Sequence, residues 1–158
     1  MKTKILSSSN TFCAVALAAL SLVTAAGSHL QADTGVAVDY RLHRVRVVHG
    51  CRHPAAYYEQ KAVQYLINHL SFARDINSDS DTSDGYYCLV SCSTRLGGYR
   101  WGVYFANGPT PAAAEAAARN LAIGRGGAIP STIRVKARWH DDCRLRAGAA
   151  DQEFDVID

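Results

Sequence analysis

The sequence predicts a ferredoxin-like βαββαβ fold, an α+β two-layer sandwich in which two helices cover one face of a four-stranded antiparallel sheet. Three observations predict it. Strand-like and helix-like segments follow one another in that order, both helical segments begin at a proline, and an even number of cysteines follows an N-terminal export signal, which predicts two disulfides. With 158 residues, of which 48% are hydrophobic, the chain is long enough for one domain with its own core.

The first half of the predicted domain begins with residues 36–47. Apolar and polar residues alternate there, but the alternation changes phase near His43, which indicates either one strand with a bulge or two short strands. Pro54 suits the first turn of a helix over residues 55–72, in which apolar side chains recur every three or four positions. Residues 74–85 are rich in Asp, Ser and Asn, so we expect them to form a loop.

The second half begins with a hairpin. Residues 86–92 and 99–106 are rich in aromatic and β-branched residues, and Gly97 and Gly98 between them indicate a turn. We therefore expect two neighbouring antiparallel strands.

A second helix and a last strand follow this hairpin. Thr110 can cap a helix over residues 112–123, Pro111 suits its first position, and Gly124 ends it. Residues 132–139 alternate between apolar and basic side chains, as a half-buried strand does. The order of elements is then that of the ferredoxin-like fold.

The N-terminus has the three-part pattern of a secretory signal peptide. Two lysines precede an apolar run over residues 12–26, which is shorter than the roughly 20 residues of a membrane span. Small residues permit cleavage after Ala25, Ala26 or Ala32. We expect a secreted protein without a membrane span, divided into a signal peptide (1–26), a flexible N-terminal segment (27–35), an α/β domain (36–146) and an acidic C-terminal tail (147–158).

The net charge is small. The chain carries 17 Lys and Arg residues against 14 Asp and Glu, which gives +3, and removal of the signal with its two lysines leaves 15 against 14. This balance argues against nucleic acid as the main partner, because polyanion binding depends on many cationic contacts.

One of the five cysteines lies in the expected signal, and the other four are Cys51, Cys88, Cys92 and Cys143. Cys88 and Cys92 stand four residues apart on a predicted strand, about 13 Å, which is too far for a disulfide. Of the two pairings left open, we favour Cys51–Cys88 with Cys92–Cys143. A metal site formed by Cys88, Cys92, His140 and Cys143 is the alternative, which the oxidising conditions of export disfavour.

The face of the predicted sheet that the helices leave open carries basic residues and one tyrosine. This basic strip predicts an anionic partner, although exposed strands also carry charge simply to prevent association. Its members are Arg44, Arg46, Arg100, Tyr104, Arg134, Lys136 and Arg138.

The sequence contains no motif that indicates a catalytic site, a cofactor or a metal. Asn77, Asp79 and Asp81 have the spacing of the first ligands of an EF-hand, but Thr82 replaces its glycine and Cys88 replaces its final glutamate. We therefore expect a non-enzymatic protein without cofactor or metal.

The signal peptide, the four remaining cysteines and the element order over residues 36–140 resemble the small secreted avirulence effectors of plant-pathogenic fungi and the viral killer toxins of smut fungi. The resemblance implies a virulence or avirulence protein that binds a host protein or an anionic host ligand, outside host cells or after entry into them. A secreted protease inhibitor or propeptide-like module, a cell-wall glycan-binding domain and a small secreted ribonuclease are the alternatives. The oligomeric state stays open.

Overall fold

The computed structural model describes residues 32–69, 72–95, 100–143 and 149–157. The expected signal peptide and the expected turn at residues 96–98 lie outside these ranges. Neither helix of the described ranges has the length and hydrophobicity that a membrane span requires.

The described residues form two antiparallel sheets and two helices, so the predicted single four-stranded sheet is wrong. The first sheet has the order β3 (Ile76–Asp81), β1 (Asp33–Asp39), β2 (Arg44–Gly50) and β7 (Gln152–Ile157). The second has the order β5 (Arg100–Gly108), β4 (Gly85–Thr94) and β6 (Arg134–Asp141). The helices are α1 (Ala55–Asn68) and α2 (Pro111–Gly124).

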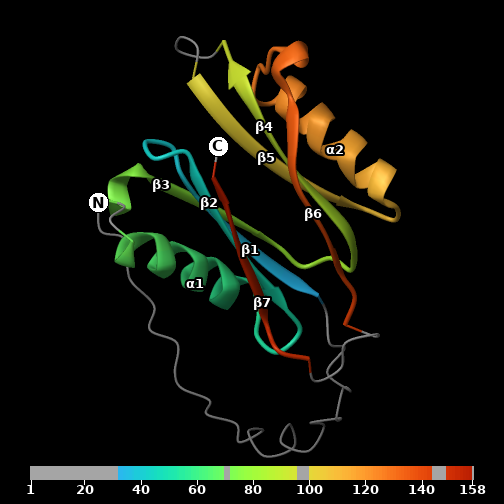
Figure 1. Ribbon diagram of the computed structural model, residues 1–158. Helices are drawn as coiled ribbons and strands as arrows, with labels where there is room; N and C mark the ends of the chain where they lie inside the picture. The colour runs from blue at the N-terminus through green and yellow to red at the C-terminus, as the bar shows by residue number, and fades with distance from the viewer. Residues whose placement is uncertain (1–31, 70–71, 96–99, 144–148, 158) are drawn as a thin grey trace, which may run out of the picture.

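The sheets face each other, and each carries one helix on its outer side, so the layers run α1, first sheet, second sheet, α2 (Figure 1). The fold differs from the ferredoxin-like one in three segments. Residues 36–47 form two strands, the hairpin of β1 and β2, which is the second of the two readings that the sequence left open, and residues 76–81 of the expected loop form β3. Residues 152–157, at the acidic end of the chain, form β7.

The helices begin where the sequence predicts. Pro54 precedes the first turn of α1, and the Thr110 hydroxyl accepts a hydrogen bond of 3.1 Å from the backbone N–H of Ala113 at the start of α2. The backbone of α1 lies very close to β1, since a Cβ atom on Gly35 would lie 2.1 Å from the backbone nitrogen of Glu59. Glycine is therefore required at position 35 for α1 to pack on its sheet.

Alternation along each strand sends side chains to two different cores. The central core lies between the sheets, and Val36 and Val47 of the first sheet meet Leu89 and Trp139 of the second there. The opposite faces of the sheets pack against the helices, as Ala37 does against α1. Both faces of each sheet are thus covered, so few side chains of the central strands are exposed to solvent.

The disulfide pattern is a correction to the sequence analysis. One disulfide joins Cys51, just after β2, to Cys143, just after β6, with the two Cα atoms 5.5 Å apart. Cys88 and Cys92 are buried free thiols in the core beneath α2, so the exclusion of a bond between them is confirmed. The favoured pairings with Cys51 and Cys143 fail because β4 points both thiols toward α2. The alternative metal site is not formed, because Cys88 and Cys92 lie in the core beneath α2, whereas Cys143 lies in a separate cluster, bonded to Cys51.

Candidate functional site

The seven residues of the predicted basic strip do not lie on one surface. Each sheet has a helix on its outer face and the other sheet on its inner face, so the open face on which they were placed does not exist. Arg46 is almost buried beneath α1, where its guanidinium lies 3.8 Å from the ring centre of Tyr65. It forms ion pairs with Glu153 and Asp155 of β7 and so links β2 to its neighbouring strand.

The other strip residues lie at three separate places. Arg44 donates to the carbonyl of His69 at the end of α1. Arg138 on β6 bonds Glu115 of α2 at 2.5 Å, and Arg134 donates to the carbonyl of Ser131 at 2.9 Å. Lys136 lies between them on β6. Arg100 and Tyr104, both on β5, lie together in a groove on the opposite side of the second sheet.

This groove runs between the edge strands of the two sheets, β3 and β5, at the end of the molecule that holds the β1–β2 turn. It consists of a larger hollow of about 720 Å³ and a smaller one of about 250 Å³, which share Tyr40, Asn77 and Tyr104. We call it the arginine groove, because four arginines line it: Arg41, Arg74, Arg100 and Arg125.

The charges in the arginine groove favour an anion. Its four arginines face two lining carboxylates, Asp75 and Asp79, so two positive charges are in excess. Arg41 lies 3.4 Å from Asp75, and the more exposed Arg74 lies 3.8 Å from it. Asp75 is thus shared by two guanidinium groups, and Arg100 and Arg125 are exposed at the surface.

Aromatic rings line part of the groove. His43 stacks on Trp101 with ring centres 4.6 Å apart and planes 17° apart, and Tyr40 meets Trp101 edge-on at 5.8 Å. His43 adopts a left-handed backbone conformation with φ of 52°, which turns the chain between β1 and β2 and brings its ring to Trp101. Burial raises the pKa of Tyr40 and of Tyr104, so both keep hydroxyl protons to donate at neutral pH.

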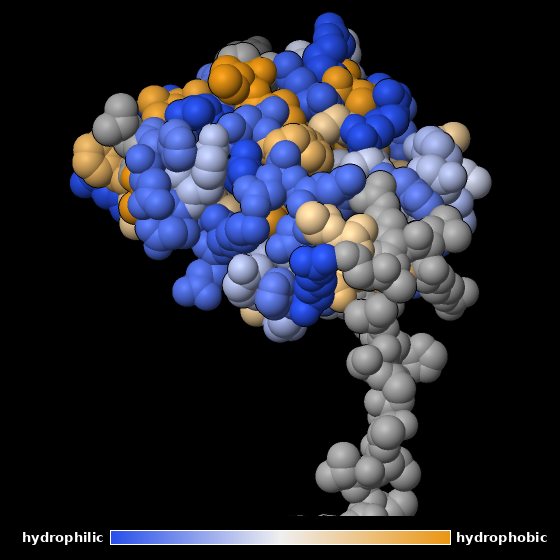
Figure 2. Space-filling model, turned by 60° about the horizontal axis from the view of Figure 1, so that its bottom comes forward, coloured by the Kyte–Doolittle hydropathy of each residue, from blue (hydrophilic) through white to orange (hydrophobic). Residues whose placement is uncertain are grey.

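Another view of the molecule shows how its apolar side chains are distributed. On the side shown in Figure 2, hydrophilic side chains predominate among the described residues, and the apolar ones form small separate groups. Scattered apolar groups of this kind are normal on a folded protein.

A second polar group lies buried between the sheets at the end opposite the arginine groove. His49 Nδ1 lies 3.2 Å from Asp141 Oδ2, and both side chains are almost completely buried. Nearby, the Tyr87 hydroxyl contacts Asp81 at 3.1 Å and donates to the carbonyl of Ser83 at 2.7 Å. Asp33, at the start of β1, belongs to the same acidic neighbourhood.

Asp33 makes the stability of the protein depend on pH. Burial, followed by the charges of Asp141, Asp81 and Asp84, raises the pKa of Asp33 from 3.8 to about 6. Between these values the unfolded chain releases a proton that the folded chain retains, so the free energy of unfolding falls as the pH rises from about 4 to 6. We expect Asp33→Asn to remove this loss and to be about 2 kcal/mol more stable than wild type at pH 7.

Urea denaturation of both proteins from pH 4 to pH 7 measures this difference. Asp79→Asn, on the exposed part of β3, is the matched control and should follow the wild-type curve. A constant difference between wild type and Asp33→Asn over this range would contradict the assignment to Asp33.

Sequence reasoning missed most of the groove. Two of the predicted site residues lie in it, Arg100 and Tyr104. Its other arginines come from the β1–β2 turn (Arg41), from the segment just before β3 (Arg74) and from the end of α2 (Arg125). One signal was present: the pair Tyr–Arg occurs at residues 40–41 and again at 99–100. The arginines of both pairs line the groove, while Tyr99 lies outside the described residues.

The arginine groove is therefore a site with basic and aromatic walls between two edge strands, suited to an anion that also carries a ring. No protein-family model matches the chain, and neither the curated proteins nor the solved structures contain a significant match.

Proposed function

We propose that the chain is a secreted binding protein of the effector type, which acts without catalysis by holding a short acidic oligosaccharide of its host in the arginine groove. The observation that carries the proposal is the meeting of four arginines with the stacked rings of His43 and Trp101 in one groove.

The two kinds of side chain match the two parts of such a ligand. Guanidinium groups donate paired hydrogen bonds to carboxylates, and these charge-assisted bonds are stronger than neutral ones. Aromatic rings such as Tyr40 and Trp101 offer apolar surface to the C–H face of a sugar ring. The hydroxyls of Tyr40 and Tyr104 add donors for ring oxygens and hydroxyls.

The groove favours a short acidic sugar over a nucleic acid. Tight binding of a polyanion needs many phosphate contacts, whereas the groove has two positive charges in excess and the whole chain has three. Two of the groove arginines also contact an aromatic ring: the guanidinium groups of Arg41 and Arg74 lie 5.1 Å and 5.7 Å from the centre of the Phe72 ring.

Secretion supports the choice of ligand, because acidic polysaccharides are abundant outside cells. The N-terminal sequence has the pattern of an export signal, and the Cys51–Cys143 disulfide is compatible with an oxidising compartment.

Titration calorimetry with tetragalacturonate at low salt tests the proposal. We expect binding that weakens as salt is added, and the double variant Arg100→Gln/Arg125→Gln should reduce the affinity about tenfold or more, since each charged hydrogen bond contributes about 1.5–3 kcal/mol. Both arginines are exposed, so the variant should keep the wild-type fold.

Arg134→Gln is the matched control, because this arginine is exposed on β6, the opposite edge strand of the same sheet. It should bind tetragalacturonate as wild type does, and the neutral maltotetraose should not bind. No binding at low salt, or equal losses for the groove variant and Arg134→Gln, would refute the proposal. Tighter binding of an RNA tetranucleotide would assign the groove to nucleic acid instead.

A further inference from the structure

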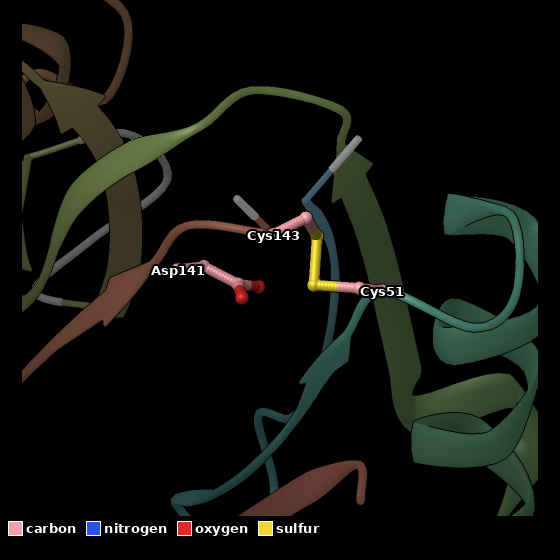
Figure 3. A group of neighbouring side chains, drawn as sticks. All are labelled: Cys51, Asp141 and Cys143. Carbon is pink, nitrogen blue, oxygen red and sulfur yellow. A yellow bond between two sulfur atoms is a disulfide. The ribbon is translucent and has the colours of Figure 1, made fainter. Parts of the chain in front are cut away.

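The two strands that the disulfide joins end in the same pattern, a metal-ligand residue followed two positions later by a cysteine. At the end of β2 these residues are His49 and, just beyond the strand, Cys51; at the end of β6 they are Asp141 and, just beyond the strand, Cys143. Figure 3 shows the Asp141 carboxylate pointing toward the disulfide from the end of β6. All four side chains are buried.

The distances within this group are those of a metal site. One carboxylate oxygen of Asp141 and the sulfur atoms of Cys51 and Cys143 all lie within 4.8 Å of one another. In a tetrahedral zinc site with Zn–S bonds of about 2.3 Å, two thiolate sulfurs lie about 3.8 Å apart. Once the sulfurs are no longer bonded to each other, a small separation is sufficient to reach that geometry.

Asp141 also lacks the partners that a buried carboxylate needs. It is completely buried, and neither of its oxygens accepts a hydrogen bond from any described residue. His49 Nδ1 lies 3.2 Å from Oδ2, in contact with the carboxylate but without the geometry of a hydrogen bond. A buried ionised group without donors is costly, and a bound cation removes that cost.

We propose that reduction of the disulfide converts this group into a zinc site with Cys51, Cys143 and Asp141 as ligands and His49 as the residue that positions the Asp141 carboxylate. Two thiolates with one carboxylate suit zinc, which accepts sulfur and oxygen ligands in tetrahedral geometry. A water molecule completes the coordination.

The chemistry balances with a dithiol as the reductant. The dithiol gives two electrons and two protons to the Cys51–Cys143 bond and becomes a cyclic disulfide, which leaves two protein thiols. Zinc then forms two Zn–S bonds, and the two thiol protons go to solvent. Because Cys51 follows the first sheet and Cys143 the second, the metal links the same two sheets that the disulfide links under oxidising conditions.

The test uses the full chain, both wild type and a Cys88→Ala/Cys92→Ala variant that lacks the two other thiols of the described domain. Each protein is stripped of metal, reduced with a phosphine and titrated with Zn²⁺, and with Co²⁺ for its thiolate absorption bands. We expect one metal ion per reduced chain and none in the oxidised protein. Near-UV circular dichroism of the zinc-bound, reduced protein should resemble that of the oxidised one.

Substitutions separate this site from accidental chelation by two thiols. Asp141→Asn should weaken zinc binding at least tenfold, and His49→Gln should weaken it about tenfold and shift the Co²⁺ spectrum. Asp39→Asn changes another fully buried aspartate, at the far end of β1, and should bind zinc as wild type does.

Three results would overturn the proposal. They are a reduced chain that binds no zinc, a reduced chain whose near-UV spectrum zinc does not restore, and an Asp141→Asn variant with unchanged affinity. None of them bears on the arginine groove, which lies at the other end of the molecule.

Discussion

Replacing both Cys51 and Cys143 with alanine is expected to lower the free energy of unfolding by about 4–5 kcal/mol. The bond closes a loop across a sequence separation of 92 residues, and a cross-link of this span removes much of the conformational freedom of the unfolded chain. It also joins the two sheets at the end where the buried His49 and Asp141 lie. Urea denaturation in the presence of a metal chelator measures the loss without interference from bound zinc.

Reduction provides an independent check on the same bond. A phosphine reductant should destabilise wild type by a similar amount and leave the Cys51→Ala/Cys143→Ala variant unchanged. Cys88→Ala/Cys92→Ala is the matched control, because it removes two buried sulfur atoms but no cross-link, and we expect it to cost about 1 kcal/mol per site. A loss below about 1 kcal/mol for the first variant would show that the bond does not constrain the unfolded chain.

Local signals in the sequence identified the helices correctly, because the residues that start a helix act within one turn. Pro54, Thr110 and Pro111 fix where α1 and α2 begin, whatever the rest of the chain does. The hairpin of β4 and β5 and the strand β6 also follow the expected segments closely.

The number of sheets was not predictable in this way, because two strands lack the usual apolar pattern. β3 consists of Ile76 followed by Asn, Ser and Asp residues, and its place at an edge depends on backbone pairing with β1. β7 reads as an acidic tail, but its acids bond Arg46 and Lys61 while Phe154 and Val156 turn toward the central core. Without these two strands, the remaining ones read as a single sheet.

The predicted basic strip depended on the prediction of a single sheet. A single sheet would leave one face open, so basic residues that alternate along its strands would share a surface. With two sheets packed face to face, Arg46 is instead covered by Tyr65 and β7. The arginine groove lies where edge strands of the two sheets come together. Predicting it therefore requires knowing how the sheets pack against each other.

Replacing Trp139 with alanine is expected to lower the free energy of unfolding by about 3–5 kcal/mol, the usual cost of removing a buried aromatic side chain. Its ring is only 8% exposed and lies in the core between the sheets. It stacks on Tyr87 with ring centres 5.1 Å apart and meets Phe154 of β7 edge-on at 5.5 Å. The variant would leave a cavity where the two sheets contact each other.

Trp101→Ala is the control that separates core packing from groove function. Trp101 is only partly buried and packs at the border of the same core, so its removal should cost clearly less stability than that of Trp139. It should nevertheless weaken tetragalacturonate binding, because its ring lines the arginine groove. Urea denaturation and calorimetry on both variants give the two quantities. If both variants lost the same free energy of unfolding, the prediction would be wrong. Trp139 would then not be the ring through which the two sheets pack.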